Sequence, residues 1–166
     1  MDVNKGLDEL IVISKEKHSL LLKYSKFTNS EKIHIRSSNI ELLLNDINNK
    51  NDIQKKIDSL DLRFYSILKD LKKELKIDSF EKINPKLYPN VLILQKTIKD
   101  IMDILKGIKK EHESNKVDLK KDFEELKSNM KTFNRNKRIT GAYKARTSPY
   151  SNTHSQISGV FIDNKK

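Results

Sequence analysis

The chain of 166 residues has no cysteine and no tryptophan, and it has only four glycines and three prolines. The lack of cysteine excludes disulfides, thiolate metal ligands and cysteine nucleophiles, and it fits a reducing compartment. The scarcity of glycine and proline leaves too few turn residues to separate the short strands of an all-β fold. We therefore predict an all-α protein.

Long hydrophobic runs are also lacking. No segment approaches the roughly 18 consecutive apolar residues of a transmembrane helix, and the first residues do not resemble a signal peptide. Only 36% of the residues are hydrophobic and 34% are charged, so we expect the apolar side chains to lie in narrow stripes along helices. The sequence predicts a cytoplasmic protein without a membrane span.

Catalytic patterns are missing as well. Four histidines are scattered along the chain, and neither a Gly-rich phosphate loop nor a nucleophile elbow is present. We expect no enzymatic activity, no cofactor and no metal site.

The strongest positive signal is a heptad pattern in the second half of the chain. Apolar residues recur there every seven positions with a second set interleaved, which is typical of a long helix packed in a bundle or coiled coil. The first set is Val91, Ile98, Leu105, His112, Leu119, Leu126 and Phe133, and the second set is Leu94, Ile101, Ile108 and Asn115. The pattern predicts a helix over about 89–134.

Two further helices are predicted before it, over about 3–26 and about 39–76. Thr28 and Ser38 each precede a glutamate by three residues, the spacing of a capping box, so we expect the chain to break near 27 and near 37. The predicted fold is an elongated three-helix bundle, a long antiparallel hairpin with a shorter N-terminal helix, over residues 1–134. Gly107 lies inside the third helix, where close helix packing is the favoured explanation and a functional bend is the alternative.

The net charge of +11 is unevenly distributed. Residues 135–166 hold seven Lys/Arg against one acid and lack an apolar period, so we predict a disordered basic tail there. The remaining +5 is spread over a mixed surface that is typical of a solvated bundle. Tyr143 and Tyr150 among the basic residues of the tail favour polyanion binding as one alternative function.

Polar residues are expected at one level of all three helices. Antiparallel packing about the predicted loops brings Ser14 and His18 level with Lys50 and Asp46, and His112 and Asn115 level with Ile53 and Lys50. The simplest interpretation is a polar layer that fixes helix register. A pH-sensitive hinge of His18, His112 and Asp46 is the alternative.

An excess of apolar surface is predicted where the second and third helices meet their connecting loop, beyond the reach of a first helix that ends near 26. Either the loop folds over this surface, or a partner's amphipathic helix fills it as a groove. The predicted partner-binding residues are Phe64, Ile67, Leu68, Leu71, Leu75, Val91, Leu92 and Leu94, with Tyr143 and Phe161 of the tail.

The chain resembles the small helical export chaperones of bacterial flagella, of the FlgN and FliT type, as found in Gram-positive, clostridium-like chains. The resemblance rests on the layout of the helices, on the stretch from Asp52 to Phe64, and on the ending with Gly141-Ala142-Tyr143 and Gly159-Val160-Phe161. It implies a chaperone that holds hook-associated flagellar proteins in an export-competent state and delivers them to a component of the export gate.

Two other functions stay open from the residues alone. A structural coiled-coil spacer would show the same heptads and would dimerise through them. A nucleic-acid-binding helical protein would explain the basic tail but is less favoured, because the body carries mixed charge. Both a monomer and a homodimer are compatible with the sequence.

Overall fold

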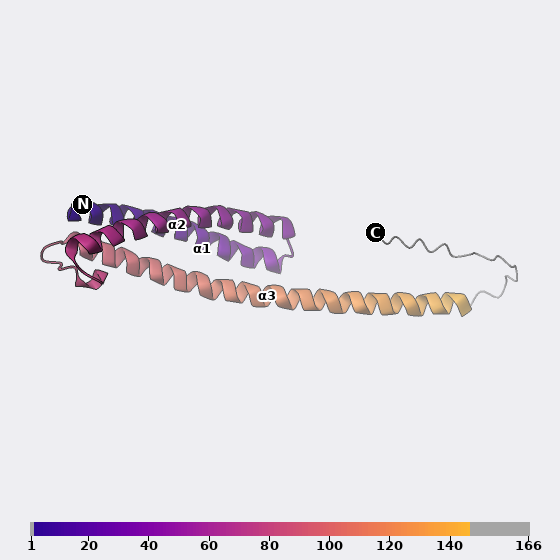
Figure 1. Cartoon of the computed structure of the whole chain (residues 1–166). Coiled ribbons are helices and arrows are strands. Elements are labelled where there is room, and N and C mark those ends of the chain that lie inside the picture. The colour runs from indigo at the N-terminus through magenta and orange to yellow at the C-terminus, as the bar shows by residue number, and fades with distance from the viewer. Residues whose placement is uncertain (1, 147–166) are drawn as a thin grey trace, which may run out of the picture. The chain divides into compact units, whose positions relative to one another are not determined.

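The computed structural model describes the backbone of residues 2–146 and the side chains of residues 2–140. Three helices and one short 3-10 turn make up this part of the chain (Figure 1): α1 (Val3–Arg36), α2 (Ile40–Leu75), η1 (Phe80–Lys82) and α3 (Asn90–Arg146). No strand occurs within it, so the all-α prediction is confirmed. None of the helices in this range combines the length and the apolarity needed to cross a bilayer.

The chain divides into two units, one ending at Asp122 and the other beginning at Phe123. In the first unit α2 runs antiparallel to α1, because Lys17 Nζ lies 2.6 Å from Asp61 near the middle of the two helices and His34 Nδ1 lies 2.9 Å from Asp46 near the turn. The direction of α3 is the same as that of α1 (Figure 1). The first unit is therefore an up-down-up bundle of three helices.

The first helix is ten residues longer than predicted. No break occurs near 27, and the Thr28 hydroxyl does not cap a new helix but donates back to the Tyr24 carbonyl, one turn earlier in α1. Glu31, the other member of the supposed capping box, pairs with Lys50 of α2 instead. The capping-box spacing at 28–31 was a false signal, since neither glycine nor proline lies nearby to end the helix.

Helix α1 ends in a hydrogen-bond pattern that satisfies its last carbonyls. The Ser38 amide donates to the Ile35 carbonyl and the Asn39 amide to the His34 carbonyl, as in a Schellman motif. Ser38 takes the left-handed conformation with φ 52°, a position where glycine is usual. Asn39 then caps α2 by accepting from the Leu42 amide. The second helix thus begins and ends within one residue of its prediction.

An apolar core fills the end of the first unit where α1 begins. Its buried residues come from α1, α2, the loop and α3: Leu7, Leu10, Ile11, Leu71, Ile83, Val91 and Leu94. A second cluster lies further along and contains Leu21, Ile53, Ile57, Ile101 and Ile108. Beyond it, towards the α1–α2 turn, the buried side chains become largely polar.

The heptad pattern of α3 is matched by burial only in part. The interleaved set Leu94, Ile101, Ile108 and Asn115 is buried, whereas Leu105 and Leu119 of the first set are 42% and 50% exposed. At Gly107 an added Cβ would meet no atom within 4 Å, so the expectation of close helix packing there is wrong.

The third helix does not end at Asn134 as predicted but continues to Arg146. An apolar period is not needed to extend an existing helix, because propagation adds one hydrogen bond per residue. Lys, Arg and Ala dominate 135–146 and are good helix formers, which explains the extension. Every side chain described in the second unit, from Phe123 to Thr140, is exposed.

Candidate functional site

The apolar surface predicted at the loop end of the bundle is covered by the chain itself. The loop folds over it, as one of the two predicted alternatives had it, because Ile83 is buried there and Phe80 and Tyr88 pack against the same cluster. Because α1 extends to Arg36, its first turns lie level with the end of α2, and Leu7, Leu10 and Ile11 pack there. The expectation that the first helix does not reach this end is therefore wrong. The predicted residues that are fully buried are Leu71, Val91 and Leu94.

The other predicted partner-binding residues take three different positions. Phe64, Ile67, Leu68 and Leu75 are partly buried against the same core, and Leu92 is 55% exposed. Tyr143 lies in α3 beyond the described side chains, and Phe161 lies outside the described residues.

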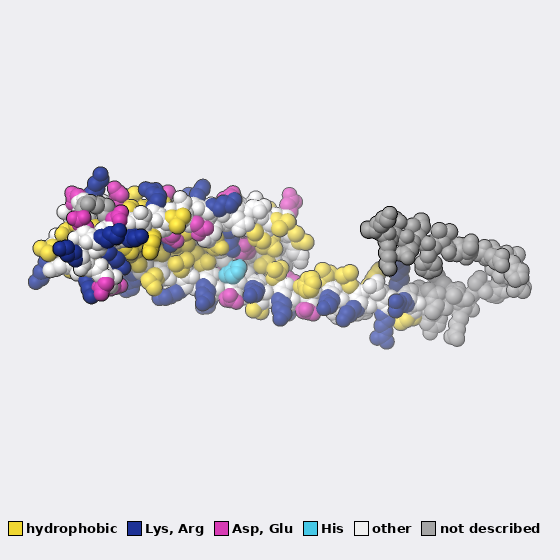
Figure 2. All heavy atoms as spheres, viewed as in Figure 1, with side chains coloured by type: hydrophobic (Ala, Val, Ile, Leu, Met, Phe, Trp, Pro, Cys, Tyr) yellow, Lys and Arg dark blue, Asp and Glu magenta, His cyan; other side chains and the backbone are white. Residues whose placement is uncertain are grey.

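An open groove is present at the opposite end of the bundle, beside the α1–α2 turn. We call it the turn-end groove. Its volume is about 360 Å³, and its lining comes from all three helices: Tyr24, Glu31, Ile35, Leu43, Ile47, Lys50, Asn51, His112, Asn115, Lys116 and Leu119. Ile47 and Leu119 are 38% and 50% exposed. Figure 2 shows apolar side chains, in yellow, at this end of the bundle.

Several more apolar residues of the turn end are exposed without lining the groove. They are Ile40, Leu42 and Leu44 of α2 and Val117 of α3, with exposures from 44% to 69%. Scattered exposed apolar residues are ordinary, but a group beside an apolar-lined groove makes this end of the bundle the candidate site. The sequence analysis missed this group because it placed the first helix in the wrong register.

A buried ion pair forms part of the groove lining. Lys50 Nζ lies 2.9 Å from both carboxylate oxygens of Glu31, and the two side chains are exposed by only 8% and 6%. The same ammonium group lies 4.8 Å from the centroid of the Tyr24 ring, within the range of a cation–π interaction. This pair ties α1 to α2 below the groove.

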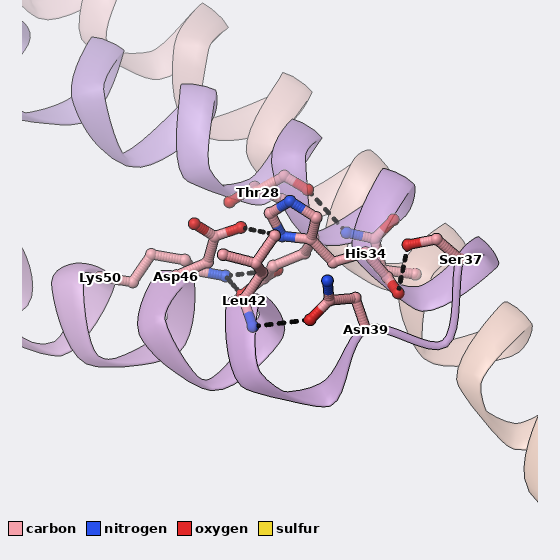
Figure 3. Close-up of polar contacts among 9 residues, drawn as sticks. Thr28, His34, Ser37, Asn39, Leu42, Asp46 and Lys50 are labelled. Carbon is pink, nitrogen blue, oxygen red and sulfur yellow. Dashed lines mark hydrogen bonds and ion pairs between the residues drawn. The ribbon is translucent and has the colours of Figure 1, made fainter.

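A second polar pair lies next to the turn. Figure 3 shows His34 and Asp46 facing each other from α1 and α2, with His34 Nδ1 2.9 Å from Asp46 Oδ2. Glu31 and His34 have the Glu-x-x-His spacing of some metal sites. Their partners are two different residues of α2, and no group of three metal-ligating side chains occurs in the described part of the chain.

Asn115 of α3 is a further buried polar residue of the groove lining. Its side chain is 4% exposed, and its amide nitrogen donates to the Thr28 carbonyl of α1 at 2.8 Å. Its carbonyl oxygen is buried and accepts no hydrogen bond from the described residues. Buried polar atoms are rarely left in this state, so the oxygen calls for an explanation.

The predicted polar layer therefore exists in altered form. Lys50 and Asn115 do come together, as the antiparallel construction for the second and third helices predicted. His18 does not lie level with Asp46, because the register of α1 against α2 places its neighbour Lys17 beside Asp61 and places His34 beside Asp46. The hinge of His18, His112 and Asp46 is consequently not assembled, and Asp46 pairs with His34.

The second unit has a surface of a different kind. Phe123, Leu126, Met130 and Phe133 follow a 3-4-3 spacing and are 59% to 69% exposed. Basic residues line a concavity of about 600 Å³ on the same helix, namely Lys131, Arg135, Lys137 and Arg138, together with Asn134.

No protein-family model matches this chain, and the comparisons with curated proteins and with solved structures give no match. The fold itself defines an all-α helical bundle, and the turn-end groove is a concave surface of it that combines apolar and buried polar lining residues.

Proposed function

We propose that this protein is an export chaperone that binds an amphipathic helix of a flagellar hook-associated protein and keeps that protein export-competent. The helix occupies the turn-end groove, and a component of the export gate receives the complex. The kind of client protein is inferred from the resemblance to FlgN- and FliT-type chaperones, which rests on the layout of the helices and on short stretches of the sequence.

The turn-end groove is the observation that carries the proposal. An amphipathic helix binds by laying its apolar face into such a groove, with anchors spaced about one turn apart. Leu43, Ile47 and Leu119 supply apolar contacts, and Lys116 lies exposed at its edge. At the other end of the bundle α1 covers the core, and a concavity of about 470 Å³ there is lined largely by lysines and offers fewer apolar side chains: Tyr65, Leu68, Lys69, Lys72, Lys73, Lys76, Ile77 and Asp78.

Calorimetric titration with the terminal helix of a hook-associated protein tests the proposal. Loss of two buried apolar contacts in the double variant Ile47→Asp, Leu119→Asp should weaken binding roughly a hundredfold or more. Both side chains are partly exposed, so circular dichroism should show an intact bundle.

Leu62→Asp provides the matched control, because Leu62 lies on α2 outside the groove lining and is 74% exposed. This variant should bind the client helix as the unmodified protein does. Normal binding by the Ile47→Asp, Leu119→Asp variant would show that the client helix does not use the groove.

Polyanion binding is a second candidate, supported by the basic concavity of the second unit. Four cationic side chains, those of Lys131, Arg135, Lys137 and Arg138, line it without an acid. Binding through phosphate contacts falls steeply with salt concentration. A titration of single-stranded RNA at low and high salt tests this candidate, and absence of binding at low salt removes it.

A coiled-coil spacer is a third candidate, supported by the exposed stripe of Phe123, Leu126, Met130 and Phe133. Such a stripe is the seam of a helical dimer when another helix covers it. Solution mass measured by sedimentation tests this candidate. A homodimer that Leu126→Asp dissociates would support it.

A further inference from the structure

The second unit carries two surface features on a single helix. An apolar stripe and a set of cations are both exposed along α3 from Phe123 onward (Figure 2). The stripe consists of Phe123, Leu126, Met130 and Phe133, whose side chains are 59% to 69% exposed. No side chain described from Phe123 to Thr140 is buried, so no described residue covers the stripe. Because helices in proteins owe most of their stability to the packing of an amphipathic face, we expect a partner to cover it.

The positions of the two features around the helix follow from the helix repeat. Successive residues turn by about 100°, so the four residues of the stripe fall within an arc of about 80°. Four cations fall within a second arc of about 80°, which begins about 40° from the edge of the stripe. They are Lys127, Lys131, Arg135 and Arg138. The stripe therefore has a basic flank, as in helices that lie in the interface of a membrane.

The charge of this segment has one sign. Residues 126–140 contain five Lys/Arg and no acid. Four of these cations line the concavity of about 600 Å³, with Asn134 as its only uncharged member. The fourth cation, Lys137, lies in line with the stripe, one turn beyond Phe133. A lysine at such a place extends its ammonium group to the membrane surface while its aliphatic part stays in apolar surroundings.

Two other kinds of occupant would each use only part of these features. A nucleic acid would contact the cations and stack on phenylalanine rings, but Leu126 and Met130 have no ring to stack on a base. A second copy of the segment 126–140 would cover the stripe, but it would double the five cations and add no acid, so the two copies would repel each other. An anionic bilayer uses both features, because its acyl chains bury apolar side chains and its phosphates attract cations.

We propose that the part of α3 from Phe123 to Thr140 binds the surface of a bilayer that contains anionic phospholipids. The helix lies in the plane of the interface, with the stripe among the acyl chains and the basic flank at the lipid phosphates. This membrane binding goes beyond the proposed client binding, and it uses no lining residue of the turn-end groove.

The lack of tryptophan in the chain allows a direct test. Phe133→Trp places a single fluorophore on the stripe of the full-length protein. Vesicles of phosphatidylglycerol and phosphatidylcholine should shift its emission to shorter wavelength, and vesicles of phosphatidylcholine alone should not. Thr132→Trp is the matched control, because Thr132 is an exposed neighbour about 140° around the helix from the middle of the stripe. Its emission should stay unchanged with both kinds of vesicle.

Two double variants in the Phe133→Trp background separate the apolar contribution from the charge. Leu126→Asp with Met130→Asp should weaken binding to the anionic vesicles roughly a hundredfold or more. Lys131→Gln with Arg135→Gln should weaken it roughly 10- to 30-fold, and added salt should weaken it as well. Circular dichroism checks the helix content of each variant. The comparison of Phe133→Trp with Thr132→Trp needs neither double variant, so it stands even where one of them loses helix.

Several outcomes would overturn the inference. Unchanged Phe133→Trp emission with both kinds of vesicle would do so, as would equal shifts with anionic and neutral vesicles or equal shifts in Phe133→Trp and Thr132→Trp. A shift that appears without vesicles and grows with protein concentration would make a second copy of this chain the occupant. Binding of single-stranded RNA without any shift on vesicles would assign the cations to a nucleic acid. The client titration is a separate measurement, so failure of this inference leaves the proposed function intact.

Discussion

Lys50 of α2 and Glu31 of α1 form a 2.9 Å ion pair in which both side chains are more than nine-tenths buried. Removal of one partner of such a pair lowers stability strongly, because it leaves an uncompensated buried charge. Removal of both partners lowers stability little, because no buried charge is left. We expect Lys50→Met to lower the free energy of unfolding by about 3 to 5 kcal/mol.

The double variant Glu31→Leu, Lys50→Met should recover most of that loss, and urea unfolding of the single and double variants measures both effects. Equal destabilisation by the single and double variants would mean that Lys50 acts through its packing on Tyr24 rather than through its charge.

The closure of the bundle by α1 predicts a contrast between two leucines of α2. Leu71 is fully buried in the core beside Leu7 and Leu10, whereas Leu62 is 74% exposed. Leu71→Ala should lower the free energy of unfolding by about 2 to 5 kcal/mol through lost contacts and a cavity. Leu62→Ala should change it by no more than about 0.5 kcal/mol. A harmless Leu71→Ala would show that α1 leaves this surface open.

Replacement of Gly107 by alanine should stabilise the fold. It lies in the interior of α3, and an added Cβ would meet no atom within 4 Å. Gly107→Ala should raise the free energy of unfolding by about 0.8 to 1 kcal/mol, because alanine gains helix propensity without a clash. Thermal unfolding measures the change, with Lys109→Ala on an exposed position of the same helix as the control. A lower melting temperature for Gly107→Ala would indicate that the helix needs flexibility at this residue.

The ion pair of Asp78, just after the end of α2, should make stability depend on pH. The neighbouring Lys82 ammonium, 2.6 Å away, holds the pKa of the Asp78 carboxyl below its ordinary value of 3.8. Since the pKa is lowered in the folded state, the stabilisation is present above the unfolded value and is lost as the pH falls through the folded pKa. The affected window thus lies below about pH 4.

Carbon-13 NMR titration of the carboxyl group measures this pKa directly. Lys82→Ala should raise the Asp78 pKa towards its ordinary value, and Lys72→Ala should raise it less, because Lys72 acts only through space and is the weakest of the contributions. Lys86→Ala, on an exposed lysine of the same loop, should leave it unchanged. An unaltered pKa in Lys82→Ala would remove the ion pair as its cause.

The fold class and the second helix could be predicted from the sequence because their signals are local. Apolar residues at helical spacing gave α2 to within one residue at each end, and Asn39 is a residue type that favours caps. The end of α1 could not be predicted in the same way. Ser38 stops that helix in a left-handed conformation, and serine is not a residue that signals such a conformation.

The error at the end of α1 led us to expect uncovered apolar surface at the end of the bundle that α1 covers. Ten additional residues shift the register of α1 against α2, so Leu7 and Leu10 cover Leu71 and the open groove lies beside Ile47 instead. The register of α2 against α3 was predicted more successfully, since the two prolines of the loop fix where that connection lies. Asn115 and Lys50 therefore meet as expected, although the ion pair of Lys50 with Glu31 required the three-dimensional structure.

The packing of Leu7 against Leu94 has a consequence for synthesis on the ribosome. The two residues belong to one buried cluster but are separated by 87 positions in the sequence. At a translation rate of about 5 to 20 residues per second, Leu94 is synthesised roughly 4 to 17 seconds after Leu7. During that interval the apolar face of the first helix can be covered only by α2, so the nascent chain itself presents a surface of the kind that cellular chaperones bind.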